Sequence, residues 1–297
     1  MPDYIYRYAG LFEKSGWKFR IMNGVLWHEY QKMVQPLGPV KAHYSLTQSQ
    51  AKELFSFFPD ALLARYTDWP QEGVRPPNGE WYAVICDKFL DTSEMSKKKR
   101  YQVNHGCKNF VVKRITPAFL AEHGYAVFAA AMTNYGFRPD SFPAREEFAK
   151  SALKNEGFED IVHIWGAFHE DKLAAYSIRY TYGKMESNTA VSKYHPDYLK
   201  YHVSHALIHT TDEYYLKECG FEYVNSGFCN ILHQTNSMSF RIETFGFRKA
   251  PVTLYMRYKP LAGLAMRLAY PFRSVLGLLD SRAKALFALE AIRRSQL

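Results

Sequence analysis

The chain has 297 residues, of which 47% are apolar, 16% aromatic and 23% charged. This composition supports one large or two packed domains and excludes a disordered, collagen-like or low-complexity protein. The formal net charge of +9 predicts an anionic partner, which could be nucleic acid, a phosphate-bearing cofactor or an acidic membrane.

The first half of the chain alternates short helices and strands. Thr47 or Ser49 is the expected cap of the first helix, Pro59 ends it, and Gly106 is the expected C-cap of a basic helix. The expected elements are a helix at 46–58, strands at 61–66 and 80–86, the basic helix at 92–105, a strand at 110–115, and helices that start at 117 and 142.

The second half is more regular. Residues 169–172 form a turn between two alternating segments, which predicts a hairpin. The expected elements are strands at 160–168, 173–180 and 186–192, a long helix at 198–219, a strand at 221–225, a helix at 236–244 and a last strand at 251–258. The order β-β-β-α-β-α-β predicts an α/β sheet that is partly antiparallel and partly parallel.

This order is similar to that of the GNAT acyltransferase superfamily. In many of these enzymes the last helix starts at an Asn, has a small residue three positions later and ends in Gly-Phe. Asn236, Ser239 and Gly246-Phe247 resemble this signature. The resemblance implies a GNAT-like mixed sheet flanked by helices, and an N-acyltransferase in which an amine attacks the carbonyl of a thioester or ester.

A second resemblance concerns the basic helix. Ser96, Lys98 and Arg100 are similar to the Ser-x-Lys-x-Arg opening of the bacterial Fem-type peptidoglycan bridge transferases, which share the GNAT fold. The matches cover about residues 96–258. We therefore expect an acyltransferase domain at 96–260. A smaller α/β segment at 1–95, interpreted as a partial second copy, precedes it, and a helical tail at 261–297 follows.

The resemblance leaves the acyl donor open between acyl-CoA and aminoacyl-tRNA. Acetyl-CoA users typically hold the pyrophosphate on a Gly-rich loop at a helix N-terminus. The equivalent segment, 192–197, contains no glycine. It is either an anion site or an ordinary loop with Pro196 at the first position of a helix. The residues expected to bind the carrier are Ser192, Lys193, Tyr194, Arg100 and Asn236.

Polar side chains concentrate in the segment 225–236, between a predicted parallel strand and a helix, where open α/β sheets bind ligands. His233 is the candidate general base because imidazole titrates near neutral pH, and Glu186 is the second candidate. The acceptor is expected to be a small-molecule or cell-wall-precursor amine. The residues expected to bind it are Ser226, Asn230, Gln234 and Thr235.

A non-catalytic RNA- or tRNA-binding module on the same fold is the alternative function. The basic run 97–100 could contact phosphates while aromatic side chains stack on bases, although such a run is also typical of a solvated helix face. No DNA partner is expected. No metal site is expected either, because His202, His205 and His209 share one helix face without a carboxylate at the spacing of a zinc motif.

Residues 261–297 are rich in Leu and Ala and contain six basic and two acidic residues. We favour amphipathic helices that pack on the rest of the protein, and contact with an acidic membrane is the alternative. The four cysteines form no CxxC pair, and neither a signal-peptide pattern nor a membrane-spanning apolar run is present. The expected location is the cytoplasm, with peripheral attachment to the inner membrane surface left open.

Overall fold

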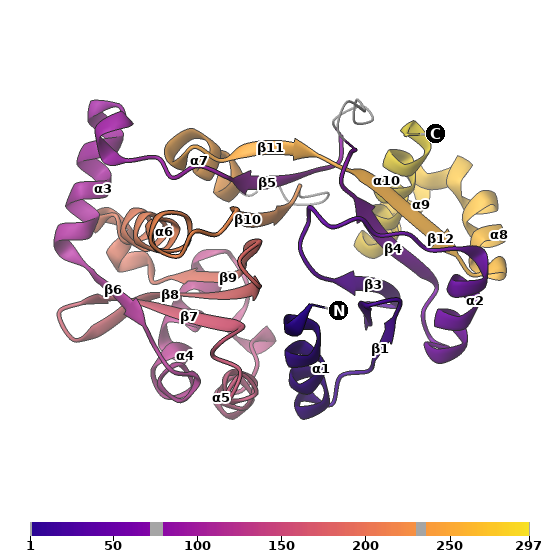
Figure 1. Ribbon diagram of the computed structural model, residues 1–297, viewed down its shortest axis with the longest axis horizontal. Coiled ribbons are helices and arrows are strands. Elements are labelled where there is room, and N and C mark those ends of the chain that lie inside the picture. Colours follow the sequence, from indigo (N-terminus) through magenta and orange to yellow (C-terminus); the bar gives the residue numbers. More distant parts are fainter. Residues whose placement is uncertain (1, 72–79, 230–235, 297) are drawn as a thin grey trace. The chain divides into compact units, whose positions relative to one another are not determined.

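The computed structural model describes residues 2–71, 80–229 and 236–296 (Figure 1). The chain forms two compact units. The first unit comprises residues 1–84, 228–239 and 249–297, and the second comprises 85–227 and 240–248. The division into domains expected at 95/96 and 260/261 stays a prediction.

The first unit contains a five-stranded sheet in the order β1-β2-β3-β4-β12. A two-residue turn at Asn23 and Gly24, with φ of 52° and 74°, joins the first two strands, as a tight antiparallel hairpin requires. The strands are β1 (Phe19–Met22), β2 (Val25–Tyr30), β3 (Met33–Leu37), β4 (Leu63–Asp68) and β12 (Thr253–Tyr258). The helices that lie wholly in this unit are α1 (Asp3–Ser15), α2 (Gln48–Phe57), α8 (Pro260–Ala269), α9 (Arg273–Leu279) and α10 (Ser281–Ser295).

Two cores hold the first unit together. In one core, α2 buries Leu54 against Trp27 and Tyr66 of the sheet, and Thr47 caps the helix as predicted. In the other, Leu289 of α10 packs with Leu254 of β12. The tail therefore supplies part of this unit's interior.

A buried carboxylate ties α10 to the sheet. Glu290 accepts hydrogen bonds from Tyr258, Arg293 and Arg294 at 2.7–2.9 Å. Burial alone would raise the pKa of Glu290, but these hydrogen bonds lower it to about 2. Glu290 is therefore ionised in the folded protein down to strongly acidic pH.

A seven-stranded sheet in the order β11-β5-β10-β9-β8-β7-β6 has most of its residues in the second unit. The strands are β5 (Tyr82–Cys86), β6 (Val111–Arg114), β7 (Val162–His169), β8 (Lys172–Tyr182), β9 (Glu186–Tyr194), β10 (Tyr223–Phe228) and β11 (Arg248–Pro251). The helices are α3 (Lys97–Asn109), α4 (Pro117–Asn134), α5 (Arg145–Leu153), α6 (Val203–Glu213) and α7 (Asn236–Phe245).

Helices cover both faces of the strands β7, β8 and β9. Tyr176 and Ile164 face α4 and α5, where they pack with Leu120 and Ala152. Side chains alternate along a strand, so Arg179 points to the opposite face, where it contacts α6. Figure 1 shows α4 and α5 on one side of these strands and α6 on the other.

The predicted strand pairing is confirmed. β7 and β8 form an antiparallel hairpin, β9 pairs antiparallel with β8, and β10 pairs in parallel with β9. The mixed α/β architecture with helices on both faces and a helical tail agrees with the expected fold class. Within the described residues, none of the helices combines the length and apolar character needed to cross a bilayer.

Three predicted details are wrong. The last strand is not continuous: β11 joins the seven-stranded sheet and β12 the five-stranded sheet. The helix expected at 198–219 is broken at His202, whose φ of 63° ends a 3-10 helix (Pro196–Tyr201) before α6 begins. Gly106 is not a C-cap but lies inside α3, where a Cβ atom would stand 2.6 Å from the carbonyl oxygen of His202.

Candidate functional site

The parallel strands β9 and β10 pair over only three residues each, 186–188 and 223–225. Beyond this point β9 continues to pair with β8 as far as Tyr194. Ala190 is an extra residue, because Thr189 and Val191 pair with consecutive residues of β8. Among the described residues, the edge of β9 beyond Asn188 therefore has no strand partner in β10. Its backbone N–H groups can donate to a substrate carbonyl.

Glu186 lies where this pairing begins and is 1% exposed. Its carboxylate accepts hydrogen bonds from the Tyr223 hydroxyl at 2.7 Å and the Asn225 amide at 2.9 Å. The Asn225 side-chain oxygen in turn accepts from the backbone N–H of Gly227 at 2.8 Å. Both oxygens of the Glu186 carboxylate thus accept hydrogen bonds. This favours a role for Glu186 in positioning β10 over a role as a general base.

A buried ion pair lies between β8 and α6. Arg179 donates to Asp212 at 3.0 Å and to the Thr211 hydroxyl at 2.5 Å, and its guanidinium lies 5.1 Å from the ring centre of Tyr215. Arg179 and Asp212 are 1% and 3% exposed. Such a pair fixes β8 against α6, because either charge left alone would be strongly disfavoured.

Arg241 of α7 is a second buried arginine, and it is 3% exposed. Within the described part of the chain, its Nη1 has no hydrogen-bond partner, and the same is true of Nε and Nη1 of Arg179. Burial lowers the pKa of the Arg241 guanidinium, Tyr194 and Asp212 oppose this shift, and Arg179 adds to it. Two buried cations thus share the field of the Asp212 carboxylate, so an anion brought to Arg241 would restore the balance of charge.

Sequence reasoning missed Arg179, Asp212 and Arg241. One signal was available for Arg241, because Thr244 and Phe245 follow at helical spacing and all three are buried on one stripe of α7. A charged residue on such a stripe indicates a buried charge.

The Cys86 thiol also interacts with the Asp212 carboxylate. Its burial, which is the largest cause, and the charge of Asp212 raise its pKa to about 12.

The residues expected to bind the carrier at the end of β9 point to opposite faces. The Ser192 hydroxyl donates to Ser177 at 3.2 Å on the α6 side. The Lys193 ammonium lies on the α4 side, 5.2 Å from the ring centre of Tyr135, and burial lowers its pKa. The Tyr194 side chain lies on the same face as Ser192, and there its electrostatic interaction with Arg241 raises the pKa of that guanidinium. Strand alternation separates Lys193 from the other two.

The break in the expected helix changes the setting of residues 195–201. The segment 192–197 leads into the 3-10 helix, and α6 begins only at Val203. The 3-10 helix borders a hollow of about 580 Å³, lined by His169, Pro196, Asp197, Tyr198, Lys200 and Tyr201. This hollow combines aromatic rings with one cation and one carboxylate.

The other predicted site residues are spread out. Arg100 is exposed, and its guanidinium donates to the carbonyl oxygens of Thr92, Ser93 and Met95. Ser226 is half-buried on β10 one residue beyond the paired segment, and Asn236 is exposed at the start of α7. Four candidates lie outside the described residues: Asn230, His233, Gln234 and Thr235.

Two of the three histidines that share a face of the long helical segment are buried. His205 and His209 are buried, and the rings of His202 and His205 lie 5.0 Å apart. Burial and the neighbouring His202 lower the pKa of His205 to about 4. In the described ranges, no group of three His, Cys, Asp or Glu side chains is arranged to hold a metal ion.

No protein-family profile and no curated protein matches the chain in sequence. Solved structures do resemble it. The C-terminal domain of a putative lysylphosphatidylglycerol synthetase from Agrobacterium fabrum has 12% identity and a TM-score of 0.53, over 88% of this chain and 90% of that chain. FemX has 8% identity and a TM-score of 0.53, over 88% of this chain and 92% of that chain.

A tandem GNAT protein from the clavulanic acid biosynthesis pathway is more distant, with 12% identity and a TM-score of 0.44 over 80% of this chain and 81% of that chain. At these identities the likeness concerns the fold. The likeness to the two structures with a TM-score of 0.53 agrees with the similarity noted in the sequence. The chain shares its fold with these two structures, and this is the kind of fold that the resemblance to the GNAT and Fem-type enzymes implies.

Proposed function

We propose that the protein is an N-acyltransferase of the GNAT type that moves an acyl or aminoacyl group from an activated carrier to an amine. The observation that supports this most directly is the short pairing of β9 with β10. Beyond this pairing, the backbone N–H groups of β9 can donate hydrogen bonds to the carbonyl oxygen of the acyl group and polarise it. Glu186 holds Tyr223 and Asn225 at that point.

The proposed reaction joins two substrates held in line. The nitrogen of the acceptor amine attacks the carbonyl carbon, and backbone N–H groups of β9 stabilise the oxyanion. The bond from the carbonyl carbon to the carrier's sulfur or oxygen then breaks, and the carrier leaves as a thiol or hydroxyl after protonation. The amine gives up its proton to a general base, for which His233 remains our candidate from the sequence.

Arg241 is the proposed contact for the carrier's negative charge. Acyl-CoA and aminoacyl-tRNA both carry phosphates, and a buried guanidinium with one unpartnered nitrogen suits such a group. The carrier is therefore acyl-CoA or aminoacyl-tRNA, and the acceptor is a small-molecule or cell-wall-precursor amine. Both carriers are found in the cytoplasm, which is the compartment that we propose.

Native mass spectrometry of the full chain as purified tests the proposal, because a bound carrier adds the mass of CoA, acyl-CoA or tRNA. A salt titration then separates the two donors. Several phosphate contacts with tRNA make log affinity fall steeply with log salt, whereas CoA gives a shallow slope. Binding of tRNA without aminoacyl transfer to any amine would support the non-catalytic alternative. If neither carrier binds to the wild type, the proposed function is wrong.

A further inference from the structure

The helices α8 and α9 leave large apolar side chains in solvent. Among the described residues, 19 large apolar residues are exposed, and seven of these lie between 261 and 279, where they are 55–84% exposed. We call these seven the apolar surface. They are Leu261, Leu264, Leu268, Phe272, Val275, Leu278 and Leu279. A concentration of this kind marks an interaction site, whereas single exposed apolar residues do not.

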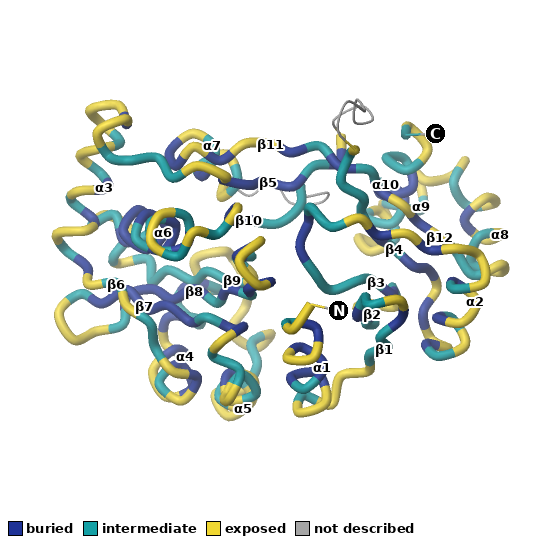
Figure 2. The backbone as a smooth tube through the Cα atoms, viewed as in Figure 1, coloured by how far each residue is buried: buried dark blue, intermediate teal, exposed yellow. Residues whose placement is uncertain are grey.

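Helical spacing places the members of the apolar surface on common faces. Leu261, Leu264 and Leu268 follow at i, i+3 and i+7 along α8, while Met266 points away from them and is buried. Val275 and Leu278 repeat the spacing along α9, which has no buried residue. Figure 2 shows these two helices largely in the colour of exposed residues.

The third helix of the tail differs from the other two. In α10, Phe287 and Leu289 are buried, and Leu289 packs with strand β12. The expectation that the tail packs on the rest of the protein therefore holds for α10. It does not account for the exposed leucines of α8 and α9.

Basic side chains accompany the apolar surface without acidic partners. The two carboxylates of residues 261–297 are already used: Glu290 pairs with Arg293 and Arg294, and Asp280 accepts from two backbone N–H groups of α10. Four exposed cations remain with no carboxylate partner among the described residues. They are Arg267, Arg273, Arg282 and Lys284.

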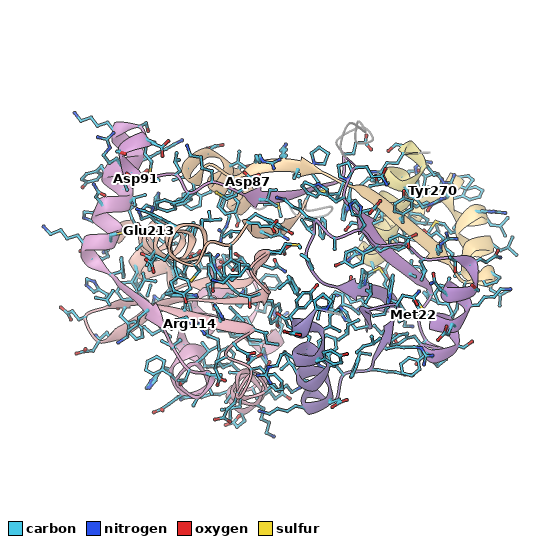
Figure 3. All side chains as sticks on the ribbon, in the orientation of Figure 1. Met22, Asp87, Asp91, Arg114, Glu213 and Tyr270 are labelled. Atoms are coloured by element: carbon cyan, nitrogen blue, oxygen red, sulfur yellow. The ribbon has the colours of Figure 1, made fainter. Side chains whose placement is uncertain are left out.

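We propose that α8 and α9 are a docking surface for an anionic lipid bilayer. Leucines and Phe272 would enter the boundary between headgroups and acyl chains, and the four cations would contact lipid phosphates. Tyr270, labelled in Figure 3, follows α8, and the centre of its ring lies 4.6 Å from the guanidinium carbon of Arg273 and 3.8 Å from that of Arg294 in α10. The ten residues of α8 extend about 15 Å, too short to span a bilayer, so the helix lies on the surface.

Co-sedimentation of the full chain with vesicles tests this surface. One set of vesicles contains phosphatidylcholine alone and the other contains added phosphatidylglycerol. The wild type is expected to bind the anionic vesicles, and binding should weaken with salt. The triple variant L264S/L268S/L278S should lose about 10-fold or more in partitioning. The control variant Leu199→Ser changes a leucine that is 41% exposed on the 3-10 helix, and it should bind as the wild type does.

A second variant, R267Q/R273Q/K284Q, tests the charges without touching the leucines and should lose anionic binding selectively. Circular dichroism and melting curves confirm that each variant is folded. Three results would refute the proposal: no binding by the wild type, equal binding by the leucine variant, or equal binding to both kinds of vesicle. Sedimentation velocity tests the alternative that a second copy of the chain covers the apolar surface. Self-association that the leucine variant abolishes, without vesicle binding, would assign the surface to a second copy of the chain.

Discussion

Arg179 and Arg241 are both buried, but replacement of each by Met is expected to affect the protein differently. Arg179→Met leaves the Asp212 carboxylate buried without its ion-pair partner. Loss of one partner of a buried pair costs about 3–5 kcal/mol of unfolding free energy. Arg241→Met instead removes a buried cation for which the described residues provide no ion-pair partner, so the free energy of unfolding should stay within about 1 kcal/mol of wild type or rise.

Urea unfolding followed by circular dichroism measures the difference. With a slope of about 1–3 kcal/mol per molar urea, the midpoint for Arg179→Met should fall by at least about 1 M. The double variant Arg179→Met/Asp212→Leu should recover most of the loss, because an apolar pair can replace a buried ion pair. The affinity for the carrier should show the reverse order, because Arg241→Met should bind the carrier more weakly than Arg179→Met does. Equal destabilisation by the two single variants, or no recovery in the double variant, would refute this reasoning.

Three further outcomes are expected. Gly106→Ala should lower stability by about 1–3 kcal/mol in thermal melts, because the added Cβ would stand 2.6 Å from the His202 carbonyl oxygen. The control Gly277→Ala, whose Cβ would meet nothing closer than 3.5 Å, should be neutral or stabilising, and equal losses would contradict the packing argument. His233→Ala should reduce acyl transfer by about 10²–10⁴-fold without loss of stability, and unchanged turnover would exclude it as the base. The pKa of Glu290 is lowered to about 2, so its contribution to stability is complete above its unfolded pKa and is lost as the pH falls toward 2. Glu290→Gln should flatten this acid dependence of the unfolding free energy, and an unchanged pH profile would refute the assignment.

The central strands could be predicted because their side chains alternate and their turns are marked. The hairpin of β7 and β8 follows from such local patterns, whereas the parallel pairing of β9 with β10 was expected from the order of the elements and the family resemblance. The strands β1–β3 were missed although they are as long as β4, β5 and β6, which were expected. Their one strong signal is the Asn23-Gly24 turn, which predicts a hairpin when it is taken with the flanking residues.

Features that depend on distant packing could not be predicted. Nothing in the sequence marks His202 as a left-handed residue, because histidine has no strong tendency to end helices. Asp212 and Arg179 resemble ordinary surface charges until β8 and α6 are brought together. The partner of β12 is β4, nearly two hundred residues earlier in the chain, so its sheet could not be inferred from neighbouring elements.

The pairing of β4 with β12 has a consequence for synthesis on the ribosome. β4 pairs with β3 over only two residues but with β12 over six. The N-terminal strands emerge early, yet the main partner of β4 emerges only after the entire second unit has been made. Until then β4 presents an open strand edge, which is a site for mispairing between nascent chains. The second unit can complete its own sheet strands β6–β10 first, so we expect cotranslational folding to start in the middle of the chain and to finish with its two ends together.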